Sequence, residues 1–311
     1  MENKKNILVP ADVPKNNQAL FIKNYNAITR ETGRLFLFSC DHKIEHLNND
    51  FYGPAINLQA LHPEHLFRIA TNGDVGAMAT HLGLLARYGN HYQNCNYIIK
   101  LNGTTHLADP HMHDPFSALL CSVDDVVTFK NNSGLSIAGI GITIYLGNEY
   151  ESEHLSQAAH AINHAHSQGL VTIAWIYFRG KSITQENDPH LIAGAAGIAV
   201  SLGADFVKVK PPLGNAITKS AQALKIASAA AGNTKLICSG GEKVDIPTYL
   251  EELYCQIHVG DSAGTATGRN IFQLPLPESI ALTHAISAIV YKNADYKSAL
   301  SLYHEMLARK G

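Results

Sequence analysis

Residues 204–212 form the segment Ala204-Asp205-Phe206-Val207-Lys208-Val209-Lys210-Pro211-Pro212, a short apolar run with two lysines that stops at a double proline. Successive side chains of a β-strand point to opposite faces, so both lysines and Phe206 share one face and the two valines share the other. In a parallel barrel the valines would pack under helices and the lysines would face the lumen. Folding gives no reason for a lysine in that lumen, which makes Lys208 a candidate amine nucleophile.

The chemistry of an amine nucleophile depends on its pKa. A free lysine has a pKa near ~10.4 and is mostly protonated at neutral pH, whereas only the neutral amine attacks a carbonyl. Desolvation and a nearby positive charge both lower this pKa. We expect burial to act on Lys208 and Lys210 to supply the positive charge, so that the pKa of Lys208 falls toward ~7–8. The structural alternative is that one lysine pairs with a carboxylate and the other is solvated.

Strand-like and helix-like segments alternate along the rest of the chain. The apolar or β-rich runs are residues 34–40, 74–80, 97–101, 137–146, 170–177, 204–210, 235–238 and 264–267, and helical spacing is found at 17–30, 153–168, 190–202 and 218–232. Strands that alternate with helices pair in parallel, and eight such strands predict an α/β protein built as a (β/α)8 TIM barrel. A doubly wound open sheet is the alternative.

No linker or change of composition divides the chain, so we expect one domain. It would consist of an N-terminal extension and helix at residues 1–33, a barrel core at 34–273 and C-terminal helices at 274–311. The two last helices, at 276–292 and 295–309, would either complete the outer ring or form an oligomer surface.

Bulk properties restrict the class of protein. The chain has 311 residues, 46% of them hydrophobic, and a formal net charge of −2, which gives no argument for nucleic acid or for an anionic membrane surface as a partner. The five cysteines are scattered without metal-binding spacing, which favours reduced thiols in a cytoplasmic protein. The apolar run Ile7-Leu8-Val9 is too short for a signal peptide, and we expect no membrane span.

Glycine-rich loops follow the last two predicted strands. Ser239-Gly240-Gly241 comes after residues 235–238, and Gly268-Arg269-Asn270 comes after residues 264–267. TIM barrels bind phosphate at the corresponding loops, where glycines let backbone N–H groups approach the anion and an arginine adds a charged contact. The alternative is that these glycines only make tight turns.

Other unusual residues lie at the predicted C-terminal ends of strands, where barrel active sites are found. Trp175 and Tyr177 alternate onto one face, and a tyrosine there can exchange a proton with a substrate hydroxyl if its phenol is activated. Asp41 is a candidate acid/base or hydroxyl ligand, and the alternative is an ion pair with Lys100. Lys100 also points inward and is a rival nucleophile.

The seventeen histidines raise the question of a metal. One cluster contains His106, His111 and His113 with Asp109 and Asp114, and a second contains His42, Glu45 and His46. Neither spacing matches a closed zinc site, so we predict no functional metal and treat most of these as loop and surface histidines.

From Gly33 to Gln273 the chain resembles the archaeal-type class I fructose-bisphosphate aldolases, a branch of the Schiff-base aldolase barrels related to deoxyribose-phosphate aldolase. The shared motifs, in order, are Arg34 to His46 with Asp-His-x-x-Glu-His, Lys100-Leu101-Asn102-Gly103, Tyr145-Leu146-Gly147, Trp175-x-Tyr177-x-Arg179-Gly180, Gly203 to Lys208, Ser239-Gly240-Gly241 and Gly268 to Gln273. Their occurrence together and in this order is what makes the resemblance specific.

The resemblance implies a metal-independent lyase without a cofactor that cleaves or forms a phosphorylated ketose, fructose 1,6-bisphosphate above all. Lys208 would form the Schiff base, Tyr177 would be the acid/base, Asp41 would orient substrate, and Trp175 would line the site. The two glycine loops would hold phosphate. Relatives form homo-oligomers. The chain departs from the family at Pro211-Pro212-Leu213, which puts the substrate in question more than the chemistry.

Three other functions remain open on the sequence. A transaldolase-like or thiolase-like enzyme could use the same lysine and glycine loops. A barrel that binds sugar phosphate without turnover would not need an amine beside a phenol. A metal-dependent aldolase would be sensitive to EDTA.

Overall fold

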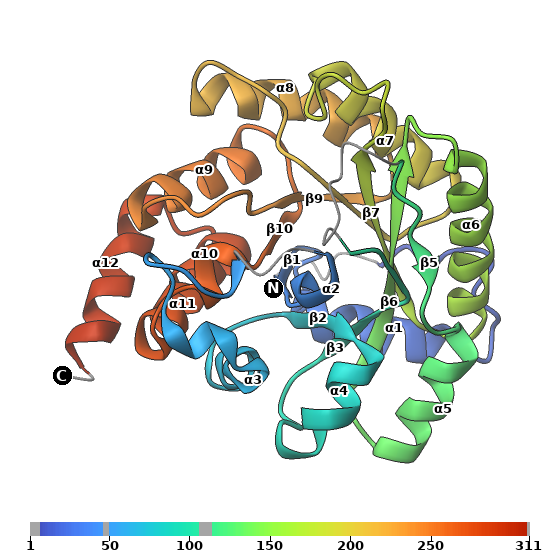
Figure 1. Cartoon of the computed structure of the whole chain (residues 1–311), viewed down its shortest axis with the longest axis horizontal. Helices are drawn as coiled ribbons and strands as arrows, with labels where there is room; N and C mark the ends of the chain where they lie inside the picture. The colour runs from blue at the N-terminus through green and yellow to red at the C-terminus, as the bar shows by residue number, and fades with distance from the viewer. Residues whose placement is uncertain (1–6, 46–49, 106–113, 310–311) are drawn as a thin grey trace.

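The computed structural model describes residues 7–45, 50–105 and 114–309. Within these residues eight parallel strands close a barrel in the order β1-β10-β9-β8-β7-β6-β3-β2 (Figure 1). The strands are β1 (Leu35–Ser39), β2 (Ala77–His81), β3 (Tyr97–Lys100), β6 (Ile137–Leu146), β7 (Val171–Phe178), β8 (Phe206–Val209), β9 (Lys235–Ser239) and β10 (Gly264–Thr267). The predicted TIM barrel is therefore confirmed, and the doubly wound alternative is wrong. A separate antiparallel pair, β4 (Asn102–Gly103) and β5 (Ala118–Leu119), lies in the connection after β3.

Helices surround the strands (Figure 1). In chain order they are α1 (Gln18–Thr29), α2 (His42–Glu45), α3 (Pro63–Asn72), α4 (Leu82–Tyr88), α5 (Val123–Ser133), α6 (Glu151–Ser167), α7 (Pro189–Ser201), α8 (Ile217–Ala230), α9 (Ile246–His258), α10 (Arg269–Phe272), α11 (Leu276–Lys292) and α12 (Tyr296–Ala308), with short 3-10 turns at Leu58–Leu61 and Gly89–His91. Side-chain caps begin several of them, since Asp188, Asp245 and Asp295 accept backbone N–H groups at the starts of α7, α9 and α12. None of the described helices is long and apolar enough to cross a lipid bilayer.

The C-terminal helices complete the outer ring. Helix α11 packs against β1, α3 and α9, and α12 packs on α9 and α11. Of the two predicted roles for this region, the structure shows the first.

The side chains of β8 point alternately to the lumen and to the helices, as predicted. Phe206 belongs to an inner cluster with Ile173 and Ile237, whereas Val207 and Val209 belong to the cluster between the strands and the helices. The register pairs Trp175 of β7 with Lys208 of β8. Lys208 therefore faces the lumen, directly beside the indole.

Helix α1 closes the barrel at the N-terminal ends of the strands. Its apolar side chains Phe21, Tyr25 and Ile28 are part of the inner cluster, and the rings of Tyr25 and Phe206 stack with centroids 5.5 Å apart. The lumen is consequently filled with apolar side chains at this end.

A buried histidine fastens the N-terminal extension beneath the barrel. The ring of His166 is fully buried, with Nδ1 2.9 Å from both carboxylate oxygens of Asp12 and Nε2 3.1 Å from Oδ2 of Asp205. Burial alone would lower the pKa of His166, but the two carboxylates outweigh it and raise the pKa above its ordinary value. Both ring nitrogens then carry protons, and the imidazolium bridges the two carboxylates.

This bridge predicts a pH-dependent stability. Because the pKa of His166 is raised in the folded state, its contribution is complete below the ordinary histidine pKa of ~6.5 and is lost as pH rises through the folded value. Asp12→Asn should lower the free energy of unfolding by about 1 kcal/mol at pH 6 and by less at pH 9. Urea titrations of the variant and the parent protein at both pH values measure this difference.

A matched control is available on the surface. His164 and Asp124 form a contact of the same type at 3.1 Å, but their side chains are 39% and 76% exposed. Asp124→Asn should have little effect at either pH, because solvent screens an exposed pair. An equal effect of the two substitutions would contradict the role of the buried bridge.

Candidate active site

A cavity of about 300 Å³ opens at the C-terminal ends of the strands. Every residue that the sequence analysis assigned to the site lines it: Lys208, Tyr177, Asp41, Trp175, Lys100, Lys210, Ser239, Gly240, Gly241, Gly268 and Arg269. They come from the ends of six strands and from the loops that follow them. The size suits a small molecule rather than a polymer.

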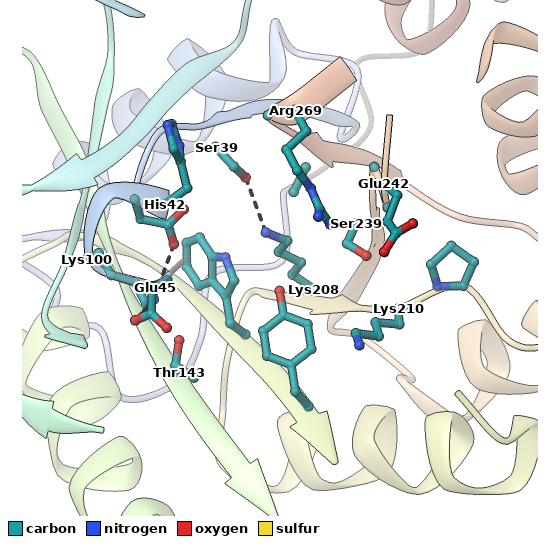
Figure 2. Close-up of a pocket in the computed structure, with 18 of the residues that line it drawn as sticks. Ser39, His42, Glu45, Lys100, Thr143, Lys208, Lys210, Ser239, Glu242 and Arg269 are labelled. Atoms are coloured by element: carbon teal, nitrogen blue, oxygen red, sulfur yellow. Dashed lines mark hydrogen bonds and ion pairs between the residues drawn. The ribbon is translucent and has the colours of Figure 1, made fainter. Parts of the chain in front are cut away.

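Lys208 lies at the bottom of this cavity, with 7% of its surface exposed. Its Nζ donates a hydrogen bond to Oγ of Ser39 at 3.3 Å and lies 5.5 Å from the centre of the Trp175 ring (Figure 2). Burial lowers the pKa of Lys208 to about 8. Roughly a tenth of the amine is therefore neutral at pH 7, compared with far less than a hundredth of an ordinary lysine.

The charges that tune this amine differ in part from the prediction. The positive charges of Lys100 and Arg269 lower the pKa of Lys208 further, while Asp41 and Glu45 oppose them. Lys210 does not have the predicted role, because its ammonium is paired with Glu186 at the mouth. The prediction that Lys210 supplies the positive charge that lowers the pKa of Lys208 was therefore wrong. The sequence of the strand does not show that Lys210 pairs with Glu186.

Lys100 is held in the opposite protonation state. It is 1% exposed, and its Nζ lies 3.0 Å from Oε1 of Glu45 and 3.3 Å from Oδ2 of Asp41. Burial alone would lower the pKa of Lys100, but the two carboxylates outweigh it and raise the pKa. A permanently charged ammonium is a poor nucleophile, which argues against Lys100 as the rival of Lys208. The ion pair with Asp41, considered above as an alternative, is present.

Trp175 contacts both lysines. Lys100 Nζ lies 5.3 Å and Lys208 Nζ 5.5 Å from the centre of its ring, so both lysines are within cation–π distance of one indole. The indole has room because its ring lies against Gly141 of β6, where a Cβ atom would collide with it. Trp175 is also the single tryptophan of the chain, which makes its fluorescence a reporter of this site alone.

Tyr177 lies one layer above Trp175 on the same face of β7. Burial, followed by the negative charges of Asp41 and Glu45, raises the pKa of Tyr177 well above its ordinary value. Its phenol is therefore protonated in the substrate-free protein, and the activation that proton removal needs has to come from a bound substrate.

The two glycine loops meet at one side of the cavity. The side-chain amide of Asn270 donates to the backbone oxygens of Gly240 and Glu242, which joins the loops after β9 and β10. Close packing also requires a glycine at position 240, because a Cβ atom there would collide with Thr267. The guanidinium of Arg269 lies 3.6 Å from Asp50 and faces the cavity. An anion bound here would meet Arg269 and closely spaced backbone groups.

The histidine clusters do not form a metal site in the described residues, where no group of three or more ligating side chains is suitably placed. The ring of His42 stacks on Phe272, and Glu45 is bound to Lys100. His46, His106, Asp109, His111 and His113 lie outside the described residues.

Among the cavity residues that were not assigned to the site from the sequence, three make polar contacts around the two buried lysines. Ser39 accepts the bond from Lys208, Glu45 pairs with Lys100, and the hydroxyl of Tyr145 donates to Oε2 of Glu45 at 3.0 Å. Alternation along β1 and β6 could have identified Ser39 and Tyr145 as lumen residues. Glu45 lies in a short helix after β1, where strand alternation gives no direction.

A TIM barrel with a partly neutral lysine deep in its lumen, next to a phenol, is a barrel enzyme suited to Schiff-base chemistry on carbonyl compounds. The chain belongs to the DeoC/LacD family of aldolases, whose family model matches residues 35–274. It is accordingly an aldolase, a carbon–carbon lyase.

Relatives with assigned names cover nearly the whole chain. A protein of Methanocaldococcus jannaschii called fructose-bisphosphate aldolase/6-deoxy-5-ketofructose 1-phosphate synthase is 46% identical over 301 residues, which are 97% of this chain and 96% of that protein. A class 1 fructose-bisphosphate aldolase of Halobacterium salinarum is 33% identical over 86% of this chain and 94% of its own length.

Solved structures agree in fold. The fructose-bisphosphate aldolase of Slackia heliotrinireducens superposes with a TM-score of 0.94 at 45% identity, over 97% of this chain and 95% of that one. An archaeal fructose-1,6-bisphosphate aldolase, with its catalytic lysine covalently bound to the carbinolamine intermediate of the substrate, superposes with a TM-score of 0.74 at 26% identity, over 87% and 99% of the two chains.

The charge arrangement predicts how Lys208 responds to the loss of Lys100. Lys100→Met removes a positive charge and leaves Asp41 and Glu45 without their cation, and both changes raise the pKa of Lys208 above about 8. The reaction of Lys208 with an amine-directed reagent, followed by peptide mass spectrometry across pH 6–10, should move to higher pH by about one unit or more.

Lys43→Met is the control, because Lys43 is a half-buried cation that packs on Phe51 and donates to the backbone oxygen of Leu61. Removal of the Lys43 charge should not change the pH dependence of the reaction of Lys208 with the reagent. A profile unchanged in Lys100→Met would show that Lys100 does not tune the amine.

Proposed function

We propose that this protein is a class I, metal-independent aldolase that cleaves fructose 1,6-bisphosphate to dihydroxyacetone phosphate and glyceraldehyde 3-phosphate, or forms it from them. The observation that carries the proposal is Lys208, a buried amine with its pKa lowered to about 8 at the bottom of a sugar-sized cavity. The names of the most similar relatives support the same substrate.

The first chemical step joins the amine to the substrate. Neutral Lys208 attacks carbon 2 of the ketose and forms a carbinolamine, and loss of the carbinolamine hydroxyl as water leaves an iminium ion. Loss of water needs a proton donor. Tyr177 suits this role, because its raised pKa keeps the phenol protonated until that moment.

The second step breaks the bond between carbons 3 and 4. Having given up its proton, Tyr177 is a phenolate beside a cationic iminium, and it can now take the proton of the hydroxyl on carbon 4. The electron pair of the broken bond moves into the iminium and gives an enamine, while the aldehyde departs. Protonation of the enamine at carbon 3 and hydrolysis of the iminium then release dihydroxyacetone phosphate and restore Lys208.

The remaining residues hold the substrate. Asp41, fixed by Lys100, is suited to accept hydroxyl groups of the sugar, and Trp175 forms a wall of the cavity. The phosphate on carbon 1 would bind Arg269 and the loops Ser239–Gly241 and Gly268. Such anchoring can contribute up to ~7–11 kcal/mol by orienting the reacting atoms.

The double name of the Methanocaldococcus jannaschii relative indicates which alternatives to test first, since both of its names contain a ketose with a phosphate on carbon 1. A substrate panel separates fructose 1,6-bisphosphate from the substrates of transaldolase-like and thiolase-like enzymes. Full activity in EDTA would argue against a metal-dependent reaction, and binding without turnover would indicate a sensor.

A cytoplasmic location and assembly into a homo-oligomer belong to the same proposal. Their support is likeness to the family, and light scattering after size-exclusion chromatography measures the assembly.

Reductive trapping tests the covalent step. Borohydride should fix dihydroxyacetone phosphate on the wild-type protein, and peptide mass spectrometry should locate the adduct on Lys208. Lys208→Met should lose the adduct completely, whereas Lys100→Met should keep it when treated at pH 9, where even an amine of raised pKa is reactive. An adduct of undiminished yield in Lys208→Met would remove this lysine from the proposed role.

Removal of one phenol tests the proton transfers. Tyr177→Phe should lower kcat for cleavage by about 10²–10⁴ with little change in KM, because the hydroxyl acts in the transition states rather than in binding. Tyr145→Phe, which removes the other cavity phenol and its bond to Glu45, should lower kcat by less than about tenfold. Equal losses in the two variants would contradict a special role for Tyr177.

A further inference from the structure

Two loops are joined at the mouth of the cavity by an ion pair. Lys210 follows β8, and its ammonium contacts the carboxylate of Glu186, which lies in the loop between β7 and α7. The same loops are also joined by a backbone hydrogen bond from Leu213 N to Asn187 O at 2.8 Å. Lys210 and Asn187 line the cavity, whereas Glu186 holds Lys210 from outside it.

The position of Lys210 relative to Lys208 places the Lys210–Glu186 ion pair where the far end of a bound substrate would lie. Lys210 comes two residues after Lys208, just beyond the end of β8, and two residues of extended chain place it about 6.6 Å nearer the mouth. Figure 2 shows Arg269 above the amine of Lys208 and Lys210 below it, and all three side chains line one cavity. A ketose with carbon 2 on Lys208 and its first phosphate at Arg269 can then direct its far end toward Lys210.

In the substrate-free protein, the positive charge of Lys210 is neutralised by the carboxylate of Glu186. Lys210 and Glu186 are each a little more than one third exposed, with side-chain values of 36% and 38%. A second phosphate at the far end would have to share Lys210 with Glu186, or displace that carboxylate. A neutral far end would leave the pair intact and gain nothing from it.

We propose that the Lys210–Glu186 pair sets the preference of the enzyme between acceptor aldehydes with and without a phosphate. Lys210 is the cation that recognises a distal phosphate, and Glu186 weakens that recognition, so that neutral acceptors compete. This inference rests on the proposed aldolase function. Lys210 directly precedes Pro211-Pro212-Leu213, the segment where the chain departs from the pattern of the family it resembles.

The experiment compares two substrates that differ in the distal phosphate alone, fructose 1,6-bisphosphate and fructose 1-phosphate. The measured quantity is the ratio of their kcat/KM values. Glu186→Gln should raise the ratio about threefold to tenfold by freeing Lys210, and Lys210→Met should lower it by a similar factor. Both changes should shrink in high salt, because partly exposed charges are screened. Lys181→Met, on the same loop but outside the cavity lining, is the control and should leave the ratio unchanged.

The outcomes separate this inference from the proposed function. Borohydride trapping of dihydroxyacetone phosphate does not involve a distal group, so it should be normal in both variants. Normal trapping with an unchanged ratio would overturn the role of the pair and leave the aldolase intact. A fall of the ratio in Glu186→Gln as well as in Lys210→Met would show that Glu186 supports phosphate recognition and would overturn the proposed competition. Failure of the wild-type protein to trap the triose would overturn the proposed function itself.

Discussion

The chemistry of this protein depends on the removal of one lysine amine from water. Lys208 is carried into the lumen by a strand whose other face is fixed under helices by Val207 and Val209. The lumen below it is filled by Phe206 and closed by Tyr25 of helix α1. Desolvation in this position disfavours the ammonium form, and the barrel provides it without any special sequence around the lysine.

The same lumen holds a second lysine in the opposite state. Lys100 and Lys208 both contact Trp175 and both are nearly inaccessible, yet Lys100 meets two carboxylates and Lys208 meets a hydroxyl. Identical side chains thus receive different pKa values from their partners. The two lysines also have different roles. Lys100 holds Asp41 and Glu45 in place, whereas Lys208 is available to react.

Much of this could be predicted from the sequence. All eight strands were located within three residues, because buried parallel strands are short apolar runs between helices. The site residues were found because strand alternation and the end of each strand give both a direction and a height in the barrel. The helices α3, α4, α5 and α9 were not specified, although α3 and α9 bury apolar residues at helical spacing, such as Leu66 and Ile69 in α3 and Leu250 and Leu253 in α9.

The chain by itself determined that a lysine would stand in a barrel lumen beside Trp175 and Tyr177, because those positions follow from local alternation and from the order of the strands. Only the tertiary structure decided which charges surround it. Glu45 reaches Lys100 from a short helix, and Glu186 reaches Lys210 from a loop 24 residues earlier. Such partners are set by how loops pack in space. Electrostatic pairing depends on distance between atoms, which sequence separation does not give.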